Sequence, residues 1–148
     1  MITQTLLAAA GTVAFALLFG VPRRYFPFCG IIGGAGWLLY GALSRCVGLT
    51  PTEATFFATV LVILLSRACA VLERCPVTVF LISGIFPLVP GAGIYWTSYY
   101  LVTGQMAQAV SSGFVAVKAA VAIVLGIVFV FEIPNRYFHW REKRLARK

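Results

Sequence analysis

Residues 75–117 contain no charged side chain, and the middle of this run reads Pro87-Leu88-Val89-Pro90-Gly91-Ala92-Gly93. As one α-helix the run would be about 65 Å long, roughly twice the hydrocarbon core of a bilayer. The two prolines remove backbone donors, and the two glycines allow backbone conformations that other residues rarely adopt. We therefore expect a helix that breaks between Pro87 and Gly93.

A break at membrane depth exposes peptide N–H and C=O groups that lipid cannot satisfy. Such backbone is tolerated where it is packed in protein or lines a polar cavity, and transporters use it to bind their substrates. The alternative is a proline kink or a re-entrant turn with only a structural role. The sequence leaves both interpretations open.

The composition predicts the fold class. Hydrophobic residues make up 61% of the chain, charged residues 11%, and the mean hydropathy is +0.95. An ordinary soluble domain carries about 25% charged residues, so we expect an all-α integral membrane protein with about five transmembrane helices. The predicted spans are residues 2–21, 28–44, 54–72, 77–103 and 113–132, of which the fourth is the broken one. They form a transmembrane domain over residues 1–133, followed by a basic cytoplasmic tail over residues 134–148.

The N-terminal segment predicts a retained first span, because residues 1–20 lack the positive region of a signal peptide. Lys and Arg counts in the short loops favour an N-terminus outside and a C-terminus in the cytoplasm of a bacterial inner or plasma membrane. This orientation makes the following residues cytoplasmic: Arg23, Arg24, Arg74, Arg136, Arg141, Lys143, Arg144, Arg147 and Lys148. The formal charge of +8 thus indicates anionic lipid at the tail and no nucleic acid.

Residue types that carry catalysis or metals are scarce. The acids are Glu53, Glu73, Glu132 and Glu142, at predicted span ends, in loops or in the tail. No nucleophile–base arrangement can be assembled from this inventory, so we expect no enzyme and no catalytic residue. The cysteines (Cys29, Cys46, Cys69 and Cys75) form no CxxC pair, and His139 stands alone. Neither a metal site nor a cofactor is expected.

Two cations fall inside predicted spans. Arg67 lies near the end of the third span, from which its side chain can snorkel to the headgroups. Lys118 lies five or six residues into the fifth span. It either snorkels outward or marks a functional site, as ionisable residues inside a membrane often do. A carboxylate for Lys118 must come from a substrate, another subunit or lipid, because the span interiors contain none.

Small and aromatic residues form three further patterns. Gly30-x-x-x-Gly34 and Ala116-x-x-x-Ala120 have the spacing at which helices pack closely in lipid. The third pattern is an aromatic cluster after the break: Tyr95, Trp96, Tyr99 and Tyr100. It forms either an interfacial belt or the lining of a pathway.

The segment Ala14-Phe15-Ala16-Leu17-Leu18-Phe19-Gly20-Val21-Pro22, the glycine-rich second span, and Ile85-Phe86-Pro87-Leu88-Val89-Pro90-Gly91 with Tyr95 after it resemble the threonine/serine exporter family. The resemblance is to its small membrane subunit, which is equivalent to the C-terminal half of the fused exporters. It implies five spans and a larger family member as partner. It also implies export of small carboxylates, either threonine and serine or a dicarboxylate such as succinate.

The residues and the resemblance together predict a membrane subunit of a secondary exporter. A half-helix beginning near Gly91 would offer unpaired amides and a positive dipole end to a substrate carboxylate. The predicted substrate-binding residues are Pro87, Pro90, Gly91, Gly93, Tyr95 and Lys118. A proton-coupling residue would belong to the partner. The alternatives are a structural or assembly subunit without a substrate site, and a small channel-forming or holin-like protein.

Overall fold

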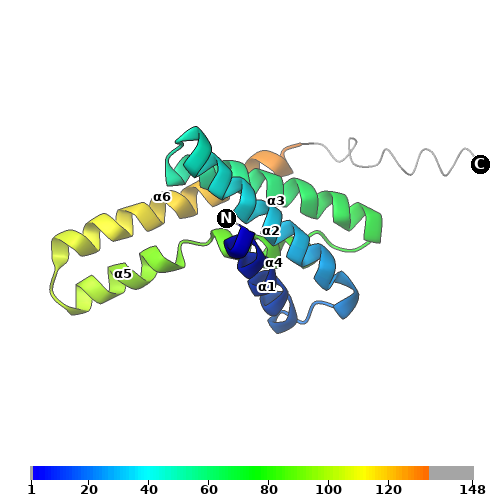
Figure 1. Cartoon of the computed structure of the whole chain (residues 1–148), viewed down its shortest axis with the longest axis horizontal. Coiled ribbons are helices and arrows are strands. Elements are labelled where there is room, and N and C mark those ends of the chain that lie inside the picture. The colour runs from blue at the N-terminus through cyan, green and yellow to red at the C-terminus, as the bar shows by residue number, and fades with distance from the viewer. Residues whose placement is uncertain (1, 134–148) are drawn as a thin grey trace, which may run out of the picture.

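The computed structural model describes residues 2–133, and every regular element in that range is helical (Figure 1). The long helices are α1 (Ile2–Leu18), α2 (Phe26–Ala42), α3 (Pro51–Glu73), α4 (Thr78–Ile85), α5 (Gly91–Val102) and α6 (Met106–Phe131). Short segments join them: the 3-10 helix η1 (Arg23–Tyr25), the π-helix η2 (Leu43–Val47) and the 3-10 helix η3 (Phe86–Leu88). The predicted tail, residues 134–148, and His139 lie outside the described residues.

Local sequence explains where α3 begins and ends. Thr50 and Glu53 form a capping box, and Pro51 takes the first helical position. The helix ends at Arg74, which has a left-handed backbone with φ of 52°. The amide of Cys75 then donates to the carbonyl of Ala70 at 3.1 Å, which satisfies one of the last carbonyls of the helix.

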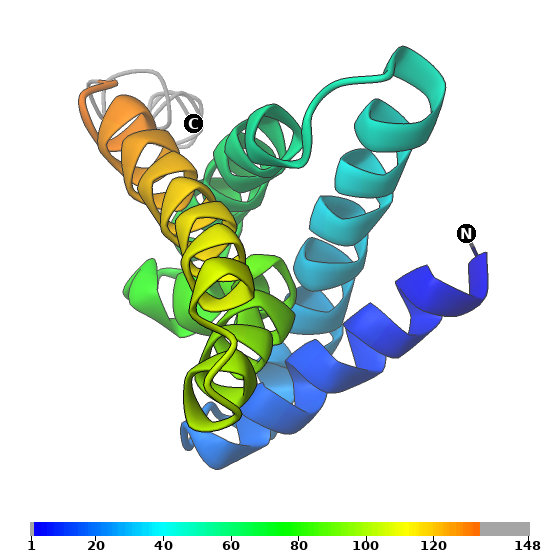
Figure 2. The same ribbon diagram turned by 90° about the vertical axis from the view of Figure 1, so that its left-hand side faces the viewer.

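The bundle consists of α1, α2, α3, α4 and the C-terminal half of α6. Helix α2 lies at its centre and packs against α1, α3, α4 and η3 (Figures 1 and 2). The buried core combines side chains from most of these elements: Tyr25, Cys29, Ile32, Ala58, Val62, Phe80, Leu88 and Ile123. The site at the helix break is therefore built on α2.

Glycines let α2 approach its neighbours closely. A Cβ atom at Gly30 would lie 3.1 Å from Val13, and one at Gly34 would lie 3.3 Å from Ala9, so this predicted packing motif is confirmed and its partner is α1. A Cβ at Gly33 would overlap the side chain of Thr12. Another glycine of α2, Gly36, faces α3, and a Cβ at this position would come within 2.5 Å of Val62.

The predicted break of the fourth span is confirmed. Helices α4 and α5 are separated by η3 and two non-helical residues, Val89 and Pro90, and the two halves are bent by 52°. Pro87 occupies the start of η3 and Pro90 the position before α5, so each proline stands where the chain leaves a regular helix.

Helix α6 begins seven residues earlier than the sequence predicts. A turn at Gly104, which has φ of 75°, follows the end of α5, and α6 starts at Met106 instead of residue 113. Gln108, Ser111 and Ser112 lower the hydropathy of this first part, which hides it from a search for apolar runs. Helix α5 and the first half of α6 form an antiparallel hairpin that extends away from the bundle (Figure 1).

Three helical segments are long and apolar enough to cross a membrane, namely Arg23–Val47, Pro51–Glu73 and Met106–Phe131. The bent pair of α4 with η3 and α5 raises the number to four when it is taken as one span. Helix α1 is apolar but has only 17 residues. The predicted count of five spans is therefore not confirmed, since it depends on α1.

The α1–α2 contact predicts how two glycines differ in their tolerance of a methyl group. Gly33→Ala should destabilise the protein by about 1–3 kcal/mol, because the new Cβ forces Thr12 out of its buried position. Gly11→Ala is the control, because nothing lies within 4 Å of a Cβ at that position of α1. Thermal unfolding in detergent, followed by fluorescence-detected gel filtration, measures both. Equal unfolding temperatures for the two variants would contradict this packing.

Candidate functional site

The helix break is packed inside the protein at one end and open at the other. Leu88 in η3 is buried, and η3 contacts α1, α2 and α3. The Cδ1 atom of Leu88 comes to 4.0 Å from the position of a Cβ on Gly36, so η3 lies directly on α2. Three residues later Gly91 is exposed. The bundle thus fixes the break on its α4 side and leaves the start of α5 accessible.

The first amides of α5 are the polar groups that the break offers. The amide of Gly91 donates to the carbonyl of Val89 at 2.7 Å, and the amide of Ile94 donates to that of Pro90 at 3.1 Å. The amides of Ala92 and Gly93 belong to the first helical turn, where no intrahelical acceptor exists. Among residues 2–133, no side chain caps this end of α5. The chain therefore presents free N–H groups at the positive end of a helix dipole.

The two glycines of the break have different surroundings. A Cβ at Gly93 would meet the Cβ of Ala116 at 3.0 Å, so Gly93 allows α5 and α6 to pack closely. This contact confirms the packing predicted for Ala116, whereas Ala120, the other residue of that motif, is exposed. A Cβ at Gly91 would have nothing within 4 Å. Gly91 is thus the position at which a side chain can be added without disturbing the α5–α6 contact.

Tyr95 lies one turn into α5, and 61% of its surface is exposed. Its ring meets that of Trp96 edge-on with 5.3 Å between the centroids, and Trp96 in turn contacts Tyr99 and Tyr100 at 5.7 and 5.8 Å. The predicted aromatic cluster is therefore one continuous set of rings along α5. It begins beside the break and extends toward the α5–α6 turn.

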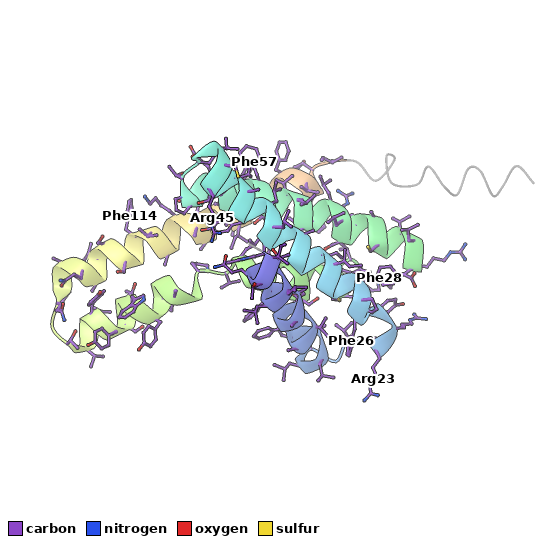
Figure 3. The ribbon with its side chains drawn as sticks, in the orientation of Figure 1. Arg23, Phe26, Phe28, Arg45, Phe57 and Phe114 are labelled. Carbon is purple, nitrogen blue, oxygen red and sulfur yellow. The ribbon has the colours of Figure 1, made fainter. Side chains whose placement is uncertain are left out.

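Lys118 is the predicted site residue that this chain does not bring to the break. Ala116 faces Gly93 on α5, and Lys118 follows two residues later, about 200° further round α6. Its side chain is exposed, and its Nζ atom lies 4.9 Å from the centre of the Phe114 ring. Figure 3 shows Phe114 on the side of the hairpin away from α5. Because α6 begins at Met106, Lys118 is also the middle residue of the helix and is not near its start.

Arg67 has a role that the sequence did not reveal. Its side chain is only 7% exposed and is not snorkelling to a headgroup. Its guanidinium donates to the carbonyl of Val130, and both Nη atoms donate to the carbonyl of Ile133 at 3.0 Å. These are carbonyls at the C-terminal end of α6, where intrahelical donors run out. Arg67 therefore caps α6 from α3, a long-range pairing that no local sequence pattern signals.

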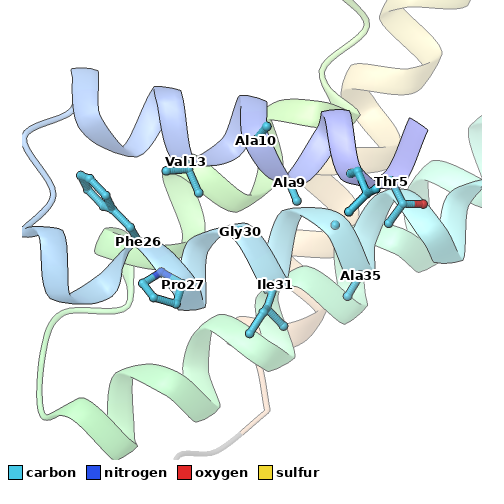
Figure 4. Close-up of a pocket in the computed structure, with 11 residues that line it drawn as sticks. Thr5, Ala9, Ala10, Val13, Phe26, Pro27, Gly30, Ile31 and Ala35 are labelled. Carbon is cyan, nitrogen blue, oxygen red and sulfur yellow. The ribbon is translucent and has the colours of Figure 1, made fainter. Parts of the chain in front are cut away.

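A groove of about 540 Å³ lies between α1 and α2 on the outside of the bundle (Figure 4). Its lining is almost entirely apolar and includes Ala9, Val13, Gly30 and Ile31, with Thr5 as its hydroxyl-bearing residue. None of the cationic side chains that the structure describes lines it. Its chemistry therefore suits an acyl chain or an apolar helix and does not suit a carboxylate.

The described part of the chain holds no group of three or more His, Cys, Asp or Glu residues arranged to bind a metal ion. Its cysteines are free thiols, with Cys29 buried, Cys46 exposed, and Cys69 and Cys75 half-buried. The polar groups that the described chain exposes include backbone amides, hydroxyls, the ammonium of Lys118 and the guanidinium groups of Arg23, Arg24, Arg45 and Arg74. This set suits binding of an anion and offers no nucleophile–base pair.

Comparison with protein-family models matches residues 4–133 to the family described as "Threonine/Serine exporter, ThrE". The match begins two residues into α1 and covers all of the later helices, including the break and the whole of α6. No solved structure matches the chain.

The capping of α6 by Arg67 predicts a graded effect of substitution. Arg67→Ala should destabilise the protein by about 2–5 kcal/mol, because it removes the hydrogen bonds to the Val130 and Ile133 carbonyls and leaves a space between α3 and α6. Arg67→Lys should recover only part of the loss, since an ammonium cannot reproduce the planar fork. The unfolding temperature in detergent measures the series. A lysine variant as stable as the natural protein would contradict the role of the fork.

Proposed function

Because this chain belongs to the threonine/serine exporter family, we propose that it is a membrane subunit of a secondary exporter of small carboxylate metabolites. The proposed substrates are amino acids of the threonine/serine type or a dicarboxylate such as succinate. The observation that carries the proposal is the family match over residues 4–133, which includes the broken fourth span.

The substrate carboxylate binds at the start of α5 in this proposal. The amides of Ala92 and Gly93 supply hydrogen bonds, and the helix dipole supplies partial positive charge. Pro87 and Pro90 hold the break open, and Tyr95 stands one turn further along α5 to contact the rest of the substrate. A half-helix N-terminus that receives an anionic substrate is an arrangement known from other transporters.

The exporter acts in this proposal as a complex with a larger subunit of the same family. Helix α1 is the fifth span, because its 17 residues extend about 26 Å and are apolar throughout most of their length. The N-terminus is outside the cell membrane and the C-terminus in the cytoplasm. The basic tail, residues 134–148, meets anionic headgroups there.

A structural or assembly subunit is the second candidate function, and one observation favours it. Gly93 packs against Ala116 and is needed for the α5–α6 contact whether or not a substrate binds. An effect of substitution at Gly93 alone thus cannot separate the two functions. Gly91 separates them, because its side-chain position is open.

Export is tested with Gly91→Leu in cells that lack the chromosomal copy and are complemented by plasmid, together with the larger subunit. We expect natural protein to lower intracellular threonine, serine or dicarboxylates after a peptide load, and Gly91→Leu to lose most of this effect. The reason is that the leucine side chain fills the open space in front of the first α5 amides. Intracellular metabolites measured by mass spectrometry give the result.

The matched control is Gly104→Asn, in the α5–α6 turn, where φ is 75° and no atom lies near a new Cβ. Asparagine tolerates this backbone, so the control should insert and export normally. Membrane levels of each variant are measured by immunoblot. Normal export by Gly91→Leu would remove the α5 start from the binding site, and no difference between deletion and complemented cells would overturn the exporter proposal.

The proposed orientation is tested with the protein's own thiols. Cys46 is exposed in η2, at the outer end of α2, and Cys75 lies beyond the cytoplasmic end of α3. An impermeant maleimide on intact cells should label Cys46, and Cys75 should react only after permeabilisation. Single-cysteine variants keep the two signals apart. Labelling of Cys75 from outside would reverse the orientation.

A further inference from the structure

The N-terminal half of α6 has three different faces. Small residues at 109, 113 and 116 face α5. Large apolar residues at 110, 114, 117 and 121 are half or more exposed, and they suit lipid. The third face carries Gln108, Ser111, Val115 and Lys118 at three- and four-residue spacing, and all four side chains are exposed.

The third face continues an interface that already exists. The four-residue spacing runs on from Lys118 to Ala122, Gly126 and Val130, which are buried against α3. A Cβ at Gly126 would lie 2.9 Å from Thr59, so the two helices touch there. Helix α3 begins at Pro51, and nothing in the described chain covers the same side of α6 further toward Met106. One face of one helix is therefore covered in its second half and bare in its first.

Neither lipid nor water suits the bare hairpin as a whole. In lipid the ammonium of Lys118 and the amide of Gln108 would lack partners, with Lys118 at the middle of a helix of 26 residues. In water the exposed apolar side chains would be uncovered, among them Val102 at 89% and Val110 at 66% exposure. The polar side chains find partners and the apolar side chains are covered when the lipid face contacts lipid and the third face contacts protein.

The charge on this face identifies the kind of protein that covers it. Lys118 needs a carboxylate, and the carboxylates of the described chain stand at helix ends: Glu53, Glu73 and Glu132. Glu53 already accepts hydrogen bonds from the amide and the hydroxyl of Thr50, both at 2.8 Å. A second copy of this chain thus has no acid within a span interior to place against Lys118.

We propose that the face of α6 formed by Gln108, Ser111, Val115 and Lys118 docks a transmembrane helix of a different chain, which sets a carboxylate against Lys118. The docked helix lies on α6 as an axial continuation of α3. This inference rests on the proposed function in one respect, namely that the larger family subunit is the chain that supplies the helix.

The test uses two valines of α6 whose side chains lie on different faces of the helix. Val115 lies on the proposed interface and Val117 on the lipid face, and their exposures are similar, at 50% and 59%. A photo-crosslinking amino acid is placed at one or the other position in the full chain, which is co-expressed with the tagged larger subunit. We expect a crosslink to that subunit from position 115 at a yield at least about tenfold above that from position 117. Mass spectrometry identifies the crosslinked chain.

The charge is tested in the same assay. Lys118→Gln should lower the crosslink yield from position 115 by at least about tenfold, because it leaves the partner's carboxylate buried and unpaired. Lys118→Glu should abolish the crosslink, and exchange of one intramembrane Asp or Glu of the larger subunit for Lys should restore it. Lys118→Arg should retain most of it.

Three outcomes would overturn the proposal. A crosslink from position 115 to a second copy would make this face a homodimer interface, and equal yields from positions 115 and 117 would make it a lipid surface. An unchanged yield in Lys118→Gln would show that no carboxylate of the partner pairs with Lys118. Crosslinking does not require transport. A docked complex without export would therefore leave this inference intact while the proposed function failed.

Discussion

Close approach of helix backbones at glycine is the interaction on which this structure depends. Lipid tails are as apolar as leucine side chains, so helices in a bilayer associate through close contact and hydrogen bonds. Helix α2 presents glycines to α1 and to α3, and Gly84 of α4 meets Ile32 of α2, where a Cβ would come to 2.8 Å. The break lies directly on this glycine-lined helix, because η3 packs on α2 next to Gly36. The position of the start of α5 is therefore a consequence of how tightly α2 is surrounded.

The interior also has to satisfy its polar groups without water. Most buried hydroxyls bond to a carbonyl of their own helix, as Thr12 does to Ala8 and Ser66 to Val62. The Nη atoms of Arg67 donate hydrogen bonds to the carbonyls at the end of α6, so Arg67 is a structural cation and not a binding residue. The first turn of α5 has free donors, and Lys118 is the exposed charge of the hairpin. The proposed anion site therefore lies on the hairpin, outside the closely packed bundle.

The helical class, the broken fourth span and the small-residue contacts could be predicted from the sequence, because they follow from local composition and from single residues such as Pro87, Pro90 and Gly30. The start of α6 could not, since Gln108 and Ser111 resemble a polar loop, and the helix there is recognised only by its packing on α5 through other residues. The capping by Arg67 depends on a contact 63 residues away in sequence. The direction of Lys118 depends on which side of α6 faces α5, and a one-dimensional pattern does not specify this. The sequence placed Lys118 with the break because both lie in apolar surroundings, whereas the packing of Gly93 on Ala116 separates them.

The separation of Lys118 from the break has an energetic meaning. An uncovered lysine at the middle of a span costs about 2.5–3.5 kcal/mol on insertion scales, which is a substantial part of the roughly 5–15 kcal/mol that stabilises a typical protein. The bundle of α1–α4 and the C-terminal half of α6 packs without the hairpin, so the cost falls on the hairpin. A helix that covers the third face of α6 recovers this energy only in the assembled complex. The same residue thus weakens the isolated hairpin and favours its pairing with a chain that brings a carboxylate. In the proposed binding mode, the substrate carboxylate meets the α5 amides on the other side of α6.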